Sequence, residues 1–278
     1  MQERDFHPPP PLDERSRLLR RLILGSLQHS GRGHPGSALS IVEILRVLYD
    51  DIMHYDPATP HWPERDRCIL SKGHGCLALY AILADKGFFP ATELSRFCAV
   101  DSPLGGHPEL DMVPGIEAST GALGHGLSMG AGMALGARLH QRRNRVFVIL
   151  GDGELNEGSV WEAAMFAKKH RLSNLVAIVD HNKLQSYGMV SEVLDMHPLP
   201  DKWRSFGFAV REVDGHNVTA LQTLLGATPF VPDTPSVIIA HTVKGKGIPM
   251  AEGNPQWHHK SLIKPEELVD MFRALEVE

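Results

Sequence analysis

Short apolar runs alternate with helical segments through the second half of this chain, and this alternation limits its fold more than any other feature. The apolar runs cover residues 146–150, 175–179, 208–213 and 237–240, with helical patterns at 159–170 and 218–225 between them. Uninterrupted apolar strands separated by helices are typical of a parallel sheet. The sequence therefore predicts an α/β fold, a parallel sheet with helices on both faces, whose ligand lies beyond the carboxyl ends of the strands.

The first half of the chain adds further elements. A short strand is expected at 67–70, and helices are expected at 12–28, 40–49, 76–86 and 121–139. Ser40 is the expected N-cap of the helix at 40–49, because Glu43 three residues later would complete a capping box. Residues 1–11 end in four consecutive prolines, which a helix interior excludes, so they are expected to form a flexible arm before a single domain at 12–278.

Composition argues against several classes of partner. The 278 residues carry a net charge of −5, which disfavours nucleic acid and anionic membrane surfaces as partners. No apolar run approaches the roughly 18 residues that a membrane span needs. The three cysteines, Cys68, Cys76 and Cys98, are too few for a disulfide scaffold, so we expect reduced thiols and a cytoplasmic location.

Two polar residues directly follow consecutive predicted strands. Asp152 follows one apolar run, within Gly151-Asp152-Gly153, and Asn182 follows the next. They are 30 positions apart (182 − 152), which leaves room for one loop, one helix and one strand, so a right-handed βαβ unit brings them to one edge of the sheet. A carboxylate and an amide oxygen suit Mg²⁺, with Ca²⁺ or Mn²⁺ as alternatives. The flanking glycines leave backbone N–H groups free for an anion, so the pattern predicts a metal-bridged diphosphate.

Two other phosphate-binding motifs do not occur in this sequence. No G-x-x-x-x-G-K-[ST] is present, and no G-x-G-x-x-G follows a predicted strand and opens a helix. A P-loop and a dinucleotide fingerprint are therefore unsupported, and the Asp152–Asn182 pair remains the best candidate for a phosphate site.

Histidine–glycine motifs narrow the interpretation further. They are Gly33-His34-Pro35-Gly36, Ser71-Lys72-Gly73-His74-Gly75, Gly106-His107-Pro108-Glu109, Thr120-Gly121-Ala122-Leu123-Gly124-His125-Gly126 and Trp257-His258-His259-Lys260. Together with the Gly-Asp-Gly and Asn pair, these motifs resemble the transketolase family, in the order of that family, from about residue 22 to residue 260. The resemblance implies a thiamine-diphosphate-binding fold and transfer of a two-carbon ketol unit from a ketose to an aldose.

The resemblance also implies roles for individual residues. It implies that the metal is held by Asp152, Asn182 and the backbone carbonyl of Leu184. The implied cofactor-binding residues are His74, Gly121, Leu123, Gly151, Asp152, Gly153, Glu157, Asn182 and His258. The implied catalytic residues, which face the sugar, are His34, His107 and His258. Glu157 resembles the glutamate that reaches across a subunit interface in this family, and Arg32, His181 and Ser186 depart from the family pattern.

One component of the chemistry is expected on another chain. Thiamine chemistry in this family needs a glutamate from a pyrimidine-binding domain, and the resemblance covers only the region that precedes that domain. We therefore expect a separately encoded C-terminal subunit, an assembly of two copies of each chain (α2β2), and a sugar or sugar phosphate as substrate. Three alternatives stay open: an E1 α-type subunit of a 2-oxo acid dehydrogenase, a 1-deoxyxylulose-phosphate synthase-like fragment, and a non-catalytic thiamine-diphosphate-binding module.

Overall fold

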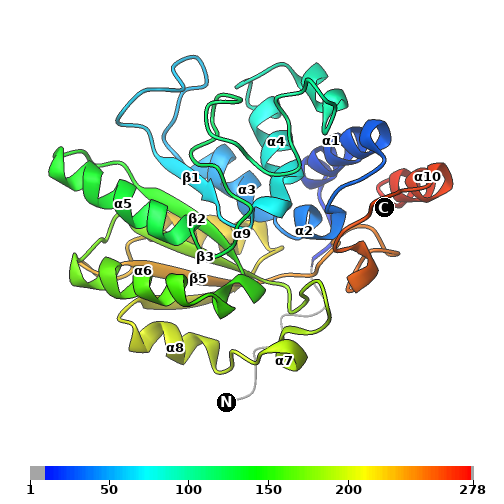
Figure 1. Cartoon of the computed structure of the whole chain (residues 1–278). Helices are drawn as coiled ribbons and strands as arrows, with labels where there is room; N and C mark the ends of the chain where they lie inside the picture. Colours follow the sequence, from blue (N-terminus) through cyan, green and yellow to red (C-terminus); the bar gives the residue numbers. More distant parts are fainter. Residues whose placement is uncertain (1–9, 277–278) are drawn as a thin grey trace.

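Five parallel strands form the centre of the computed structural model, which describes residues 10–276 (Figure 1). They are β1 Arg67–Leu70, β2 Val146–Gly151, β3 Leu175–His181, β4 Ala209–Asp214 and β5 Ser236–His241. Their order across the sheet is β1-β2-β3-β5-β4, and every neighbouring pair is parallel. The predicted parallel sheet is confirmed, and each predicted apolar run forms one of its strands.

Helices of different lengths surround these strands. The α-helices are α1 Glu14–Ser30, α2 Pro35–Leu39, α3 Val42–Val47, α4 Cys76–Asp85, α5 Gly126–Leu139, α6 Gly158–Lys169, α7 Val190–Val193, α8 Leu199–Ser205, α9 Val218–Gly226 and α10 Pro265–Ala274. A π-helical turn, η1 Leu48–Ile52, extends α3, and 3₁₀ turns occur at η2 Gly73–Gly75, η3 Ala91–Arg96, η4 Gly153–Asn156 and η5 Pro255–Trp257.

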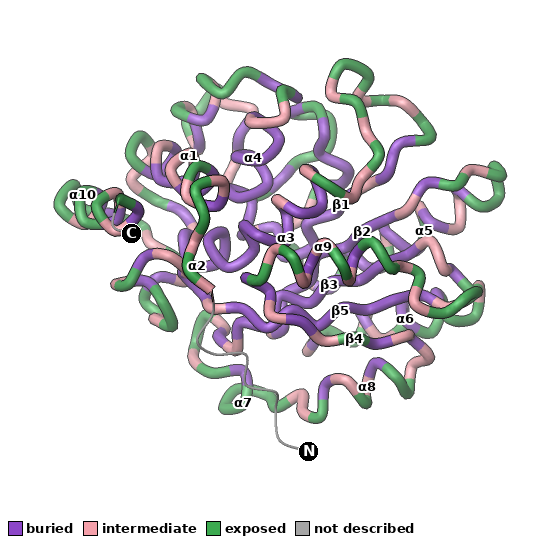
Figure 2. The backbone as a smooth tube through the Cα atoms, turned by 180° about the vertical axis from the view of Figure 1, so that it is seen from behind, coloured by how far each residue is buried: buried purple, intermediate pink, exposed green. Residues whose placement is uncertain are grey.

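The sheet is buried because both of its faces are apolar. In β2, Phe147 and Ile149 belong to one buried cluster, and Val148 and Leu150 belong to the other. Helices α1, α3, α4 and α9 contribute to the first cluster, whereas α5, α6 and α8 contribute to the second. Figure 2 shows β2, β3 and β5 buried between these helical layers, whereas the edge strand β4 is only partly buried. Full burial of each such side chain stabilises the fold by roughly 1.5–3 kcal/mol, which holds the strand ends in fixed positions.

The expected capping box at Ser40 is wrong. Residue Pro35 begins the earlier helix α2, where a proline at the first helical position is favoured, and Ser40 is the residue at which α2 ends. The Ser40 hydroxyl donates to Asp180 at 2.7 Å instead of capping a helix. Glu43 lies inside α3 and binds Arg20 rather than the backbone of Ser40. Both side chains therefore make long-range contacts.

The helix expected at 121–139 begins later than the sequence indicated. Gly121 and Gly124 have φ values of +142° and +85°, which a right-handed helix excludes. Helix α5 consequently begins at Gly126, and residues 121–125 form a turn at the carboxyl edge of the sheet. This turn carries part of the candidate site.

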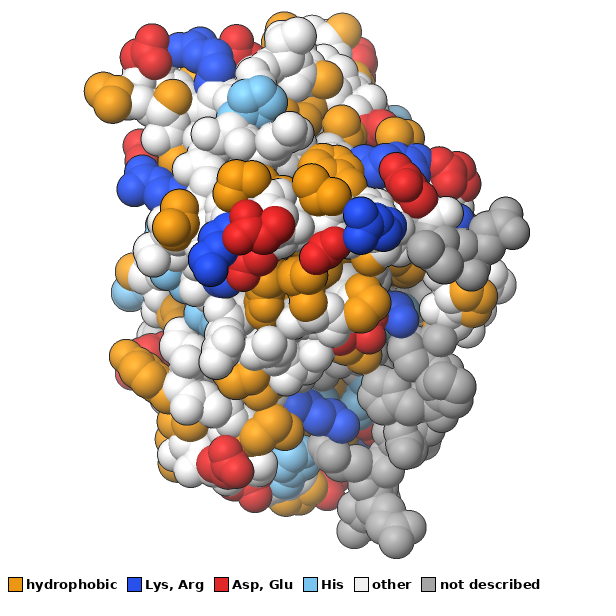
Figure 3. Space-filling view, turned by 90° about the vertical axis from the view of Figure 1, so that its right-hand side faces the viewer, with side chains coloured by type: hydrophobic (Ala, Val, Ile, Leu, Met, Phe, Trp, Pro, Cys, Tyr) orange, Lys and Arg blue, Asp and Glu red, His pale blue; other side chains and the backbone are white. Residues whose placement is uncertain are grey.

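The N-terminal arm expected at residues 1–11 falls mostly on residues 1–9, which lie outside the described residues. Between residues 10 and 276, no helix is long and apolar enough to cross a membrane. On the face shown in Figure 3, acidic and basic side chains lie next to one another among apolar ones. Helix α10 illustrates this mixture with an ion pair between Arg273 and Asp270 at 2.9 Å.

Two glycines in α5 lead to a prediction about packing. A Cβ at Gly130 would lie 2.4 Å from Cγ2 of Val148 in β2, whereas a Cβ at Gly132 would have no neighbour within 4 Å. We expect Gly130→Ala to lower the free energy of unfolding by about 1–3 kcal/mol because it overpacks the helix–sheet contact.

Gly132→Ala is the matched control for this change. It should raise stability by up to about 1 kcal/mol, because alanine favours the helix and meets no obstacle. Urea unfolding of both variants measures the difference, and equal effects at the two positions would contradict this account of α5.

Candidate active site

A cavity of about 310 Å³ lies at the carboxyl ends of the strands. Its walls come from the loops that follow β1, β2, β3 and β5, together with the turn before α5 and the segments around η5 and α2. The lining residues are His34, Lys72, His74, His107, Gly121, Leu123, Gly151, Asp152, Gly153, Glu154, Asn182, Leu184, Gln185, Ser186, Tyr187, Lys244 and His258. The cavity is therefore where the sheet topology places a ligand.

The structure brings together all the predicted site residues except one. His34, His74, His107, Gly121, Leu123, Gly151, Asp152, Gly153, Asn182, Leu184 and His258 all line this cavity. Glu157 does not line it and is exposed at the residue before α6. It lies against the turn before α5, since a Cβ at Gly124 would come within 2.6 Å of the Glu157 Cβ.

Backbone hydrogen bonds hold the two strand-end residues together. The Asp152 N–H donates to the Asp180 carbonyl at 3.3 Å, in continuation of the β2–β3 ladder. The Lys183 N–H donates to Asp152 Oδ2 at 2.5 Å, and the Leu184 N–H donates to Asn182 Oδ1 at 3.1 Å. The carboxylate and the amide oxygen therefore lie at the same edge of the sheet, as predicted.

Asp180 fixes the orientation of the Asn182 amide. This carboxylate is fully buried, and its Oδ2 accepts a hydrogen bond from Asn182 Nδ2 at 2.8 Å. Because the nitrogen is used in this way, the oxygen is the end of the amide that is able to bind a cation, through the lone pair that the Leu184 N–H does not occupy. Asp180 also accepts from Lys72, Thr242 and Ser40. Burial would raise the pKa of Asp180, but the Lys72 ammonium and these hydrogen bonds outweigh it and lower that pKa.

The oxygen atoms at this edge fit a hard divalent cation. Among the described residues, no group of three or more His, Cys, Asp or Glu side chains could hold a metal. The cavity instead offers the Asp152 carboxylate, the Asn182 amide oxygen and the Leu184 carbonyl, a set that suits Mg²⁺ when water and phosphate oxygens complete the shell. The Leu184 carbonyl already accepts a hydrogen bond from the Lys244 ammonium at 2.7 Å, so it faces positive charge inside the cavity.

Two buried lysines that were not predicted as site residues also line the cavity. Lys72 and Lys244 are 1% and 2% exposed. Burial, with a contribution from Lys72, lowers the pKa of Lys244 to about 8, so this side chain is still mostly protonated at neutral pH. The signal for both was present, because Lys72 and Lys244 follow the β1 and β5 strands at the same edge as Asp152 and Asn182.

Glu154 is another lining residue that was not predicted. It is 2% exposed, and it accepts hydrogen bonds from the N–H groups of Gly124 and Gly151, each at 2.9 Å, and from the Ser71 hydroxyl. Burial raises the pKa of this carboxyl group. Its contacts tie the turn before α5 to the end of β2, so it shapes the cavity wall.

Four histidines lie together beside the two lysines of the cavity. The ring centroid of His34 lies 5.5 Å from His74, 5.9 Å from His107 and 5.8 Å from His258. Burial lowers the pKa of His34 to about 4 and of His258 to about 3, and it also lowers the pKa values of His74 and His107. Buried Nδ1 of His258 has no hydrogen-bond partner among the described residues. These rings are therefore neutral at pH 7 and able to bind hydroxyl groups of a ligand.

Comparison with known proteins agrees with this geometry. The family model described as "Transketolase, thiamine diphosphate binding domain" matches residues 14–275. This chain belongs to the transketolase family. The resemblance inferred from the sequence motifs is thus confirmed, and so is the thiamine-diphosphate-binding fold.

Relatives in the transketolase family have two different lengths. The chain is 42% identical over 251 residues to the 6-deoxy-6-sulfo-D-fructose transketolase subunit SqwG of Clostridium sp., covering 90% of this chain and 91% of the relative. It is 42% identical over 252 residues to an apulose-4-phosphate transketolase subunit of Actinobacillus succinogenes, covering 90% of each. A solved transketolase variant from Pichia stipitis matches with a TM-score of 0.87 and 30% identity, over 93% of this chain and 40% of that longer chain.

The neutral histidines lead to a prediction about pH. The ordinary pKa of His34 is 6.5 and burial lowers it to about 4 in the folded chain, so between these values the unfolded chain binds a proton that the folded chain does not. The free energy of unfolding should therefore fall as the pH is lowered from about 6.5 to about 4. His34→Gln removes one such group, and its stability should fall less steeply.

Urea unfolding at intervals between pH 4.5 and 7 measures these slopes. His140→Gln, which changes an exposed histidine outside the cavity, is the control and should keep the wild-type slope. Identical slopes for wild type and His34→Gln would contradict a His34 that is neutral in the folded chain.

Proposed function

We propose that this chain is the cofactor-diphosphate-binding subunit of a two-chain transketolase, which transfers a two-carbon ketol unit from a ketose, or ketose phosphate, to an aldose or its phosphate. The observation that carries the proposal is the composition of one cavity. Hard oxygen atoms and two lysines form one end, and neutral histidines form the other, with His74 near Lys72 and His258 near Lys244 where the two ends meet. The first end suits a metal-bound diphosphate and the second suits a substrate rich in hydroxyl groups.

At the diphosphate end, this chain supplies the groups that hold a charged cofactor. Asp152, Asn182 Oδ1 and the Leu184 carbonyl would bind Mg²⁺, or Ca²⁺ or Mn²⁺. The N–H of Gly153, with the side chains of His74, His258 and Lys244, would bind the diphosphate, and Leu123 would pack on the thiazolium ring, beside Gly121 and Gly151. When bound, thiamine diphosphate supplies the electron sink that carbon–carbon bond cleavage requires.

At the substrate end, His34, His107 and His258 hold and orient hydroxyl groups. Because burial keeps these imidazoles neutral, each has one nitrogen that donates and one that accepts a proton, so each is able to bind a hydroxyl or to move its proton. His34 and His258 are partly buried and His107 is exposed, so a ligand is able to reach all three rings.

A partner chain is the second part of the proposal. Two relatives that match over about 90% of this chain are named as transketolase subunits, which supports a separately encoded partner that supplies the pyrimidine-binding domain. We propose an assembly of two copies of each chain, in which the exposed Glu157 contacts a neighbouring subunit. We also propose a single domain at 12–278 and a cytoplasmic location, the latter because Cys68, Cys76 and Cys98 are free thiols.

A reconstitution experiment tests the ketol transfer. The purified chain alone, supplied with thiamine diphosphate and Mg²⁺, should interconvert no sugars. Addition of the candidate partner subunit should produce transfer from a ketose to an aldose, measured by chromatography of the sugars. Turnover by the chain alone would contradict the two-chain proposal, and absence of turnover with a partner that forms a complex would favour a non-catalytic binding module.

A substitution tests the metal centre. Asp152→Ala should weaken Mg²⁺-dependent binding of thiamine diphosphate by at least about tenfold, because it removes the only carboxylate proposed for the metal. Titration calorimetry measures the affinity, and thermal unfolding checks that the variant is folded. Asp270→Ala, on the exposed surface of α10, is the control. Unchanged cofactor affinity in Asp152→Ala would remove this residue from the site.

A further inference from the structure

A buried ion pair joins α1 to α3 beneath the loop that carries Lys244. Arg20 and Glu43 are 0% and 1% exposed. The two side chains form a bidentate pair, with Arg20 Nη1 2.5 Å from Glu43 Oε1 and Nη2 3.0 Å from Oε2. Apolar side chains of similar volume often give equal or greater stability than a buried ion pair. Stability alone is therefore an incomplete reason for these charges.

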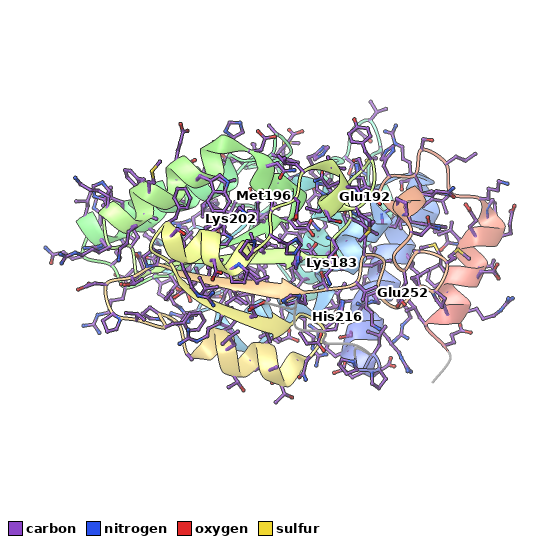
Figure 4. All side chains as sticks on the ribbon, turned by 90° about the horizontal axis from the view of Figure 1, so that it is seen from below. Lys183, Glu192, Met196, Lys202, His216 and Glu252 are labelled. Carbon is purple, nitrogen blue, oxygen red and sulfur yellow. The ribbon has the colours of Figure 1, made fainter. Side chains whose placement is uncertain are left out.

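His216 connects this ion pair to the Lys244 loop. Its Nδ1 lies 2.9 Å from Glu43 Oε2, and its Nε2 accepts a hydrogen bond from the Val243 N–H at 2.8 Å. A ring nitrogen that accepts a hydrogen bond carries no proton, so the proton is on Nδ1 and is donated to Glu43. Glu43 thus selects the histidine tautomer that is able to hold Val243. His216 lies at the end of β4, beside the N-terminal helices (Figure 4).

The same network holds the other side of the loop. Arg20 Nε donates to the Lys246 carbonyl at 2.8 Å. Val243 and Lys246 flank Lys244, so one backbone group before and one after this lysine are fixed by the same buried cluster. Between them, Gly245 has φ +81°, and its N–H donates to the Gly36 carbonyl at 3.0 Å. The backbone of the loop has little freedom to move.

Lys244 is the residue whose position this network determines. Its side chain is 2% exposed, lines the cavity and donates to the Leu184 carbonyl at 2.7 Å. We propose that Arg20, Glu43 and His216 are positioning residues that set where the Lys244 ammonium lies against the diphosphate end of the cavity. The proposal rests on the function proposed above, since it assigns an anionic ligand to that end.

A double-mutant cycle tests the proposal through cofactor affinity. His216→Leu removes both hydrogen bonds of the ring, and Lys244→Met removes the ammonium group but keeps the apolar stem. Each change should weaken Mg²⁺-dependent binding of thiamine diphosphate by about tenfold, measured by titration calorimetry. If His216 acts through Lys244, the double variant binds no more weakly than Lys244→Met alone. Independent losses that multiply in the double variant would overturn the proposal.

A second buried ion pair provides the matched control. Arg65 and Glu117 are 6% and 8% exposed, and they also form a bidentate pair, but they do not line the cavity. Glu117→Gln should lower the melting temperature and leave cofactor affinity unchanged, whereas Glu43→Gln should lower both. His216→Gln, which places an acceptor near the Val243 N–H, should restore part of the affinity. Equal effects of Glu43→Gln and Glu117→Gln on affinity would contradict a positioning role.

A labelling experiment tests the positioning role independently of the proposed function. If the wild type shows no Mg²⁺-dependent binding of thiamine diphosphate, the proposed function fails, but the position of Lys244 is still measurable. Acetic anhydride treatment followed by mass spectrometry compares labelling of Lys244 with that of Lys72, which Asp180 holds. Glu43→Gln should raise labelling of Lys244 several-fold relative to Lys72. An unchanged labelling ratio would overturn the positioning role. If His216→Leu does not fold, Glu43→Gln replaces it as the test variant.

Discussion

The buried carboxylate of Asp180 is the group on which the cavity depends. It lies at the end of the central strand β3 and accepts hydrogen bonds from Lys72, Ser40, Thr242 and Asn182. These four residues come from the loop after β1, the end of α2, the loop after β5 and the loop after β3 itself. An ammonium group as deeply buried as that of Lys72 needs such a partner, because an unpaired buried charge is strongly destabilising. One carboxylate therefore holds together four segments of the chain that surround the cavity.

The cavity has two ends of different polarity, and the difference follows from burial. Hard oxygen atoms and the Lys244 ammonium lie at the end formed by β2, β3 and β5, where charge is matched by charge. The histidine rings at the other end lie against one another, and burial keeps them neutral. This arrangement therefore suits two molecules bound together, a cofactor with an anionic tail and a substrate rich in hydroxyl groups.

The strands were predictable from the sequence because apolar runs are local patterns. The residues of the site that directly follow β2 and β3 were predictable because the carboxyl ends of parallel strands lie at one edge of the sheet. The sequence did not predict contacts between residues far apart in the chain. The local pattern at Ser40 indicated a helix cap, but its partner Asp180 is 140 positions away. The position of Lys244 after β5 was a signal for the site, but its contact with the Leu184 carbonyl, which spans 60 positions, was not predictable from local sequence. The Gly- and Ala-rich composition of residues 121–139 favoured one helix, but the positive φ values of Gly121 and Gly124 delay the start of α5 to Gly126.

A crystal structure with thiamine diphosphate and Mn²⁺, with anomalous scattering used to place the metal, tests the central claim most directly. We expect an anomalous peak within coordination distance of Asp152, the Asn182 amide oxygen and the Leu184 carbonyl, with the diphosphate beside it. A peak at another place, or a cofactor bound with those three oxygens directed away from it, would contradict the account.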